Sequence, residues 1–207
     1  MSSADIRVDE LLQNPQLWRA KGINASAPSL PTGFDVLDER LPGGGWPTRG
    51  LIEILLDSPG SSELNVLMPL LRQLCGVENN WHAWIAPPYE IYPPALHACG
   101  ISIERMLVVR TSQALWAMEQ SLRSGACRIV IGWTNRARLQ GLRRLQLAAE
   151  QSRSLGILFR HSRWRKESSP AVLRLLLEPI PAGLRVSIVK SRGGRGGQVV
   201  LQMVSNG

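Results

Sequence analysis

Short apolar runs alternate with segments of helical period along most of the chain. Apolar runs of strand length cover residues 51–56, 81–86, 106–110, 128–133 and 156–160. Between them, apolar residues recur at the spacing of one helix face in the segments 64–74, 115–122 and 139–149. Pro69 must start or kink the first of these helices, because proline lacks the backbone N–H that a helix interior uses. This alternation predicts βα units on a mainly parallel sheet flanked by helices.

The pattern changes after residue 170. Apolar runs at 172–177 and 198–204 enclose a segment in which Leu184, Val186 and Ile188 alternate with polar residues, as expected of a strand with one buried face. Residues 191–197 contain four glycines and two arginines, which favours a tight hairpin or a mobile basic loop. We therefore expect antiparallel strands at the C-terminal end of a single α/β domain that covers residues 31–207. Residues 1–30 are expected to form a partly disordered N-terminal arm.

The composition bounds the class of protein. A chain of 207 residues with 44% hydrophobic content can bury one substantial core. No run approaches the roughly 18 to 20 uncharged apolar residues that a membrane span needs, and the first residues are polar and acidic, unlike a signal peptide. We therefore expect a cytoplasmic protein with no membrane partner.

Conventional catalytic and metal chemistry has little support in the sequence. Cys75, Cys99 and Cys127 are odd in number and widely spaced, which favours buried free thiols over a disulfide framework or a zinc site. The three histidines have no Cys or acid at ligand spacing, and the serines of the 58–62 segment have no indicated base. We expect no metal, no cofactor and no catalytic residue.

The positive charge is concentrated in one part of the chain. Residues 1–150 hold 14 Lys and Arg against 14 Asp and Glu, whereas residues 151–207 hold 10 against 2. Between Arg123 and Lys166 there are eleven basic residues and one acid, Glu150. Such a basic block suits nucleic acid or an acidic protein partner, although a solvated surface that favours solubility has the same composition.

The segment PTGFDVLDERLPGGGWPTRGLIEIL, residues 31–55, resembles the start of RecA-family ATPase cores. In that family a Thr-Gly turn, an apolar helix and a glycine-rich stretch lead into the first strand. The segments 93–109 and 114–133 resemble the RecA helix–strand units that follow, and 190–197 lies where that family often has a basic, glycine-containing loop. The resemblance implies a RecA-like core with a mainly parallel sheet.

Two narrower families share this pattern. ImuA, a RecA-like accessory protein of the SOS-inducible translesion system, is similar from the PTGFDVLD opening onward. The run from residue 63 to about residue 170, with LNVLMPLLRQL, WHAWIAPP and RSGACRIVIGW, resembles the SOS cell-division inhibitor SulA. Because the RecA-type opening and the basic tail lie outside the SulA-like run, we identify the chain as an ImuA-family member with a SulA-like core.

The RecA resemblance also allows the ATPase positions to be compared. A P-loop needs glycine amides that face the phosphates, a Lys for the β and γ phosphates and a hydroxyl for Mg²⁺. In the ungapped register, Glu63 falls at the Lys position and Leu64 at the hydroxyl position, and no Lys or Arg occurs anywhere between residues 57 and 68. The degenerate loop comprises Pro59, Gly60, Ser61, Ser62, Glu63 and Leu64.

Two further ATPase positions carry unsuitable residues. The glutamate that activates water in the family falls on Pro88, and the Walker B aspartate falls on Trp133. Hydrolysis needs charge at these points to hold the metal and orient the water. We predict a degenerate P-loop fold without ATP hydrolysis, with weak nucleotide binding through loop amides as the alternative.

A contact surface for DNA or a protein partner is the remaining candidate site. Trp164 stands inside the cationic run RHSRWRK, which is typical of loops that grip single-stranded nucleic acid by stacking, but a protein contact or a plain surface fits the same residues. The candidate residues are Arg136, Arg138, Arg143, Arg144, Arg160, Arg163, Trp164, Arg165, Lys166, Lys190, Arg192 and Arg195.

Three functions follow from these resemblances as hypotheses. The ImuA resemblance implies an accessory role in translesion synthesis, with ImuB and an error-prone C-family DNA polymerase as partners and RecA and DNA as further candidates. The SulA resemblance implies a cell-division inhibitor that binds FtsZ and blocks septation. A weak, DNA-stimulated RecA-like ATPase is the third hypothesis.

Overall fold

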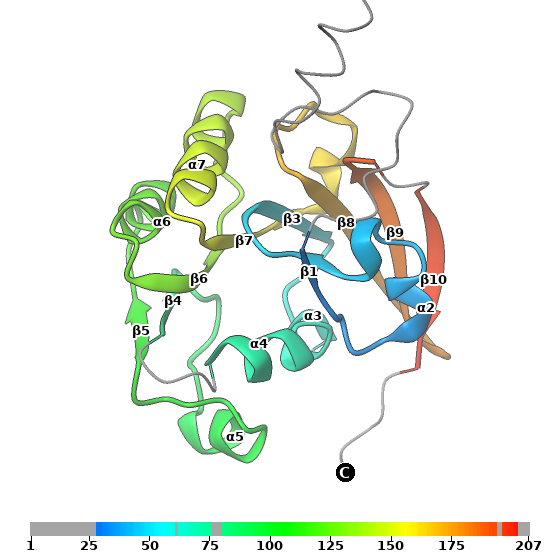
Figure 1. Ribbon diagram of the computed structural model, residues 1–207, viewed down its shortest axis with the longest axis horizontal. Helices are drawn as coiled ribbons and strands as arrows, with labels where there is room; N and C mark the ends of the chain where they lie inside the picture. Colours follow the sequence, from blue (N-terminus) through cyan, green and yellow to red (C-terminus); the bar gives the residue numbers. More distant parts are fainter. Residues whose placement is uncertain (1–27, 61, 76–79, 194–195, 203–207) are drawn as a thin grey trace, which may run out of the picture.

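The protein is built on one eight-stranded sheet with helices on both faces, together with a small two-stranded sheet (Figure 1). The computed structural model describes residues 28–60, 62–75, 80–193 and 196–202. The large sheet has the order β10-β9-β8-β3-β7-β6-β4-β5. Its strands are β3 (Gly50–Leu56), β4 (Trp81–Ile85), β5 (Met106–Val109), β6 (Cys127–Trp133), β7 (Leu155–His161), β8 (Leu173–Ile180), β9 (Gly183–Ser191) and β10 (Gly197–Leu201).

The strands from β8 to β5 in this order run parallel, and β9 is antiparallel to both of its neighbours. Each of the five predicted central strands is present, with ends within two residues of the predicted ones. The three predicted C-terminal apolar runs form β8, β9 and β10. The prediction of a mainly parallel α/β sheet with antiparallel strands at its C-terminal end is therefore confirmed.

The helices divide between the two faces of the large sheet (Figure 1). One face carries α3 (Ser62–Asn65), α4 (Met68–Cys75) and α5 (Pro93–Ala98), and the other carries α6 (Ala114–Arg123) and α7 (Leu139–Gln151). Pro69 is the second residue of α4, where the missing N–H has no partner to lose. The single helix expected from the spacing at 64–74 is thus two short ones.

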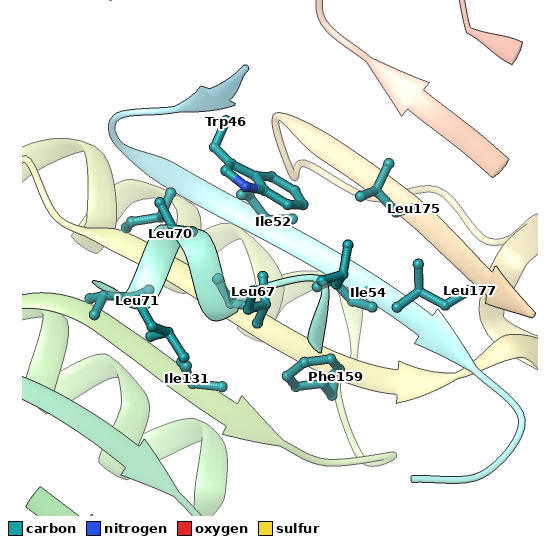
Figure 2. Packing of buried hydrophobic residues seen from close by; sticks show 14 of the residues in the cluster. Trp46, Ile52, Ile54, Leu67, Leu70, Leu71, Ile131, Phe159, Leu175 and Leu177 are labelled. Carbon is teal, nitrogen blue, oxygen red and sulfur yellow. The ribbon is translucent and has the colours of Figure 1, made fainter. Parts of the chain in front are cut away.

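Alternate residues of the central strands fill two separate apolar layers. Ile52 and Ile54 of β3 pack with Leu70 and Leu71 of α4 on one face, as Figure 2 shows, whereas Leu51 points to the layer under α6 and α7. Successive side chains of a strand point to opposite faces, so β3 needs apolar residues on both faces to serve both layers. Every residue of β3 is buried, including Glu53.

The small sheet closes the first layer beside β3. In it β1 (Ser29–Leu30) pairs with β2 (Trp46–Pro47), and the connection contains α2 (Asp35–Asp38) and the 3₁₀ turn η1 (Pro42–Gly44). Trp46 is fully buried against Ile52 (Figure 2). The predicted N-terminal arm, 1–30, lies outside the described residues except for its last three. Within the described chain, no helix is both long and apolar enough to cross a bilayer.

Parallel strands give the large sheet two distinct edges. The carboxyl edge is where β3, β4, β6 and β7 end, and the amino edge is where they begin. In open α/β sheets ligands bind beyond the carboxyl ends of the strands, where neighbouring connections leave toward opposite faces. Here β4 is followed by α5 on one face, whereas its neighbour β6 is followed by α7 on the other. The loop residues predicted to be degenerate lie at this edge.

Candidate functional site

The loop between β3 and α3 contains its own anion. Both carboxylate oxygens of Glu63 accept the backbone N–H of Gly60, each at 2.8 Å. The Glu63 side chain is only 4% exposed, and desolvation raises its pKa, opposed by hydrogen bonds from its own backbone N–H and from Gly60. The loop amide that a phosphate would need is therefore already used by a carboxylate of the chain.

The positions compared with the ATPase meet in space. Gly60, Glu63, Leu64, Pro88 and Trp133 line one cavity of about 290 Å³ at the carboxyl edge. Pro59 lies beside it, where its carbonyl accepts the Tyr89 hydroxyl at 3.0 Å. Ser61 and the Ser62 side chain lie outside the described residues. Residues from three separate segments of the chain, which the RecA resemblance had matched to ATPase positions, thus lie together in the fold.

The walls of this cavity are aromatic and apolar. Trp133 stacks on Phe159 with ring centroids 5.1 Å apart and an interplanar angle of 16°, and Trp84 lies 5.7 Å from Trp133. Among the described residues that line the cavity there is no Lys or Arg, and Glu63 and Glu90 are its charged groups. A triphosphate would meet negative charge and apolar surface there, whereas an uncharged apolar group would meet neither obstacle.

The prediction that Arg160 stands in an exposed cationic loop is wrong. Arg160 is 2% exposed and belongs to β7, where its guanidinium donates to Glu53 at 2.8 Å and to the Ala137 carbonyl at 2.9 Å. Arg174 of β8 donates to the second oxygen of Glu53 at 2.6 Å. The three side chains form a buried triad on the face of the sheet that carries α7.

Glu53 is a structural residue beneath the basic segment, and it was not identified from the sequence. A single acid inside the otherwise apolar strand GLIEILL was the available signal, because a buried carboxylate needs a cationic partner. Arg174 also donates to the carbonyls of Trp164, Arg165 and Glu167. The triad therefore anchors the cationic segment η2 (Ser162–Lys166) to the sheet.

The remaining cations of η2 are exposed. Arg163, Arg165 and Lys166 point to solvent, and Ser162 donates to Asp57 at the end of β3. The guanidinium carbons of Arg160 and Arg163 lie 5.2 and 5.1 Å from the centroid of the Trp164 ring. Trp164 is half-buried and already makes two cation–π contacts within the chain, so its contact with nucleic acid stays a prediction.

The connection from β6 to α7 lies beside η2. Asn135 accepts the His161 backbone N–H at 2.8 Å, and the Ala137 carbonyl accepts from Arg160. These bonds bring the exposed Arg136 and Arg138 close to the segment that carries Arg163. We call the resulting group the carboxyl-edge basic surface, and it consists of Arg136, Arg138, Arg163, Arg165 and Lys166.

Two other candidate arginines lie on α7. Arg143 is exposed, whereas Arg144 pairs with the buried carboxylate of Glu119 at 3.2 Å, which also accepts from Arg123 at 2.9 Å. Arg144 thus holds α7 against α6. Of the two, Arg143 is the one whose charge is available to a partner.

The C-terminal basic candidates lie at the amino edge of the sheet. Lys190 pairs in register with Arg174 near the start of β8, and its ammonium group donates to the Ser169 carbonyl. Desolvation, followed by repulsion from Arg192 and Arg174, lowers the pKa of Lys190. Arg192 lies 3.5 Å from Glu150, and Arg195 lies outside the described residues. The predicted basic residues therefore form two surfaces.

Comparisons with known proteins match parts of this architecture. The family model described as cell division inhibitor SulA matches residues 51–156. A cell division inhibitor SulA from Edwardsiella piscicida is 38% identical over 96 residues, which are 45% of this chain and 56% of that protein, so the chain spans little more than half of this relative. Protein ImuA from Caulobacter vibrioides is 25% identical over 209 residues, covering 87% of this chain and 86% of that protein.

A solved structure is also similar in part. The crystal structure of SulA from Pseudomonas aeruginosa aligns with a TM-score of 0.45 and 25% identity, covering 53% of this chain and 97% of that one. The similarity to ImuA together with a SulA-like core, predicted from the sequence, is confirmed by the sequence matches. The SulA match covers residues 51–156, so it begins earlier than the predicted residue 63, which brings β3 into it, and it ends before the predicted limit of about residue 170.

Proposed function

The chain belongs to the family of the cell division inhibitor SulA through residues 51–156, and from that premise we propose that it serves the SOS response to DNA damage as an ImuA-like accessory protein for translesion synthesis. The observation that carries this proposal is the extent of the similarity to ImuA, which covers 87% of the chain and therefore reaches beyond residues 51–156 on both sides. A SulA-like role alone would leave the similarity to ImuA outside residues 51–156 unexplained.

The proposal includes the partners that the ImuA resemblance implies. These are ImuB and an error-prone C-family DNA polymerase, with RecA and DNA as further candidates, and the cytoplasm is the expected location. The carboxyl-edge basic surface is the proposed contact, because five exposed cations from two segments are held on a rigid support by the Glu53 triad. Long-range attraction of an acidic partner or of DNA suits such a surface.

We also propose that the protein has a degenerate RecA-like core, which binds its partners and does not hydrolyse ATP. The support for this proposal is the Glu63 carboxylate on the Gly60 amide, together with Pro88 and Trp133 in the same cavity. A carboxylate in place of a lysine reverses the sign of a charge that a triphosphate needs. We expect no phosphate release when single-stranded DNA and ATP are added, and sustained turnover would overturn this part.

The test is co-purification with ImuB after nuclease treatment, which removes bridging DNA. The wild-type chain should retain ImuB, and a variant with Arg163→Glu, Arg165→Glu and Lys166→Glu should lose most of it. Arg185→Glu is the control for charge reversal outside this surface, because Arg185 is a half-exposed cation on β9, and it is compared with Arg165→Glu alone, which changes the charge by the same amount. Failure of the full-length wild-type proteins to associate would contradict the proposal. Equal retention of ImuB by all variants would show that the contact lies on another surface.

Inhibition of cell division is the second candidate function, and the family match itself favours it. In that case the partner is FtsZ, and the purified protein should suppress FtsZ assembly measured by light scattering. Overexpression should also produce filamentous cells. Normal division together with unaffected assembly would remove this candidate and leave the ImuA-like role.

A further inference from the structure

A second cavity opens at the amino edge of the sheet, away from the degenerate loop. Its volume is about 490 Å³, which is within the range of sites for small organic ligands. Four arginines from four different segments line it: Arg49 precedes β3, Arg128 is the second residue of β6, Arg153 precedes β7 and Arg192 follows β9. Of these only Arg192 was a candidate from the sequence. The fold thus gathers cations that are far apart along the chain.

Backbone contacts hold two of these arginines in place. Arg128 donates to the Arg153 carbonyl at 2.6 Å, and Arg192 donates to the Pro170 carbonyl at 3.2 Å. Arg153 has a φ of 55°, a left-handed conformation that the surrounding structure must stabilise. The guanidiniums of Arg49 and Arg153 make no hydrogen bond or salt bridge to another described residue. The cavity therefore combines fixed cations with cations that can still bind a ligand.

The charge of the cavity is strongly unbalanced. Glu150 is its one described carboxylate, and it lies 3.5 Å from Arg192, with both side chains partly exposed. The lining also has apolar residues, which include Pro42, Pro47 and Val172. Inorganic anions would use the cations and leave these apolar residues bare. An anion with a planar organic body would use both.

We propose that this amino-edge cavity binds a nucleotide, with its phosphate held by the arginines and its sugar and base against the apolar wall. Guanidiniums bind phosphate oxygens in pairs and stack on planar rings, so they suit both parts of such a ligand. Arg128, Glu150 and Arg153 lie inside the SulA-family match, whereas Arg49 and Arg192 lie outside it. The complete cavity is thus a feature of the longer chain and separate from the proposed partner surface.

The first experiment titrates the full chain with matched probes and follows binding by calorimetry. Thymidine 5′-monophosphate should bind at least about tenfold more tightly than thymidine, which lacks the phosphate, and more tightly than inorganic phosphate, which lacks the body. A flat titration with the monophosphate, or equal affinity for all three probes, would overturn the proposal. A 5′-phosphorylated oligothymidylate tests whether the natural ligand is a free nucleotide or the end of a DNA strand. Tighter binding than the monophosphate assigns the cavity to a strand end, and weaker binding assigns it to a free nucleotide.

Charge variants test the site in both directions. Arg49→Glu and Arg192→Glu should each weaken monophosphate binding about tenfold. Glu150→Gln should strengthen it about threefold, because it removes the carboxylate that competes for Arg192. A gain of affinity cannot come from partial unfolding, so an unchanged or weaker Glu150→Gln variant would contradict the assignment.

The control separates this inference from the proposed function. Arg165→Glu changes an exposed cation of the carboxyl-edge basic surface and should leave monophosphate binding unchanged. Conversely, Arg192→Glu should still retain ImuB. Loss of monophosphate binding in Arg165→Glu equal to that in Arg192→Glu would show general electrostatic attraction and overturn the assigned cavity.

Discussion

Replacement of Glu53 by alanine removes the one anion between two buried cations. Glu53 is fully buried, and the side chains of Arg160 and Arg174 are 1% and 4% exposed. The carboxylate accepts from Arg160 at 2.8 Å and from Arg174 at 2.6 Å. Two hydrogen bonds between charged groups contribute on the order of 3–6 kcal/mol together. Removal of one partner of a buried ion pair typically costs about 3–5 kcal/mol.

The surroundings place the expected loss in the lower part of that range. Arg160 keeps its bond to the Ala137 carbonyl, and Arg174 keeps its bonds to three carbonyls of the η2 region. We therefore expect Glu53→Ala to lower the free energy of unfolding by about 3–4 kcal/mol. With a urea slope of about 2 kcal/mol per molar, the unfolding midpoint falls by about 1.5–2 M.

Urea titration followed by far-UV circular dichroism measures this change. Glu178→Ala is the matched control, because Glu178 is partly exposed and lies 4.0 Å from Arg185, so its loss should cost less than about 0.5 kcal/mol. A Glu53→Ala protein within about 1 kcal/mol of the wild type, measured with an unchanged urea slope, would refute the view that the triad holds η2 on the sheet.

Three further predictions concern titratable groups. Burial raises the pKa of Glu63 above 4.5, so the folded state binds its proton more tightly and stability should fall as pH rises through that window. Glu63→Gln should remove the fall in urea midpoint, and an identical pH profile for both proteins would contradict this. Burial lowers the pKa of His82 below 6.5, so stability should fall as pH decreases below 6.5. His82→Gln should make the urea midpoint depend less on pH below 6.5, and an unchanged pH dependence would assign the fall in stability to other groups. Burial raises the pKa of Cys75 to about 12 and also raises that of Cys127, whereas Cys99 is half-buried. Ellman's reagent at pH 8 should therefore label one thiol rapidly and the others only after unfolding, and rapid labelling of all three would be inconsistent with the core packing.

The central sheet was predictable because its strands carry a strong local signal. A short and largely apolar run such as 51–56 favours a strand buried on both faces, and the structure forms it within one residue of the expected start. The division of the basic residues between two edges was not predictable in the same way. It depends on β8 lying beside β3 and parallel to it, because the antiparallel β9 then carries Arg192 to the amino edge while Arg163 stays at the other. Spacing along the chain contains no such information.

Arg160 shows the same limit within a single segment. It stands at the end of the apolar run 156–160 and at the start of the cationic run RHSRWRK, so composition alone also allows an exposed loop. The alternation along β7 instead places it on the same face as Leu158, where Glu53 of the adjacent strand supplies a partner. The charges of Glu53 and Arg160 can be recognised as partners only when their two strands are known to be neighbours. The acid in β3 and the arginine in β7 explain each other only in three dimensions.

The residues of the degenerate loop depend on one another in a related way. Glu63 satisfies the Gly60 amide, and Trp133, which the RecA resemblance aligns with a metal-binding acid, packs on Phe159. A lysine at 63 would lose the bond to Gly60 and meet the apolar surface of Leu64 and Trp133 in the cavity they share. These residues therefore form a packed and hydrogen-bonded arrangement, and we expect that a lysine at position 63 alone would not create a phosphate site there.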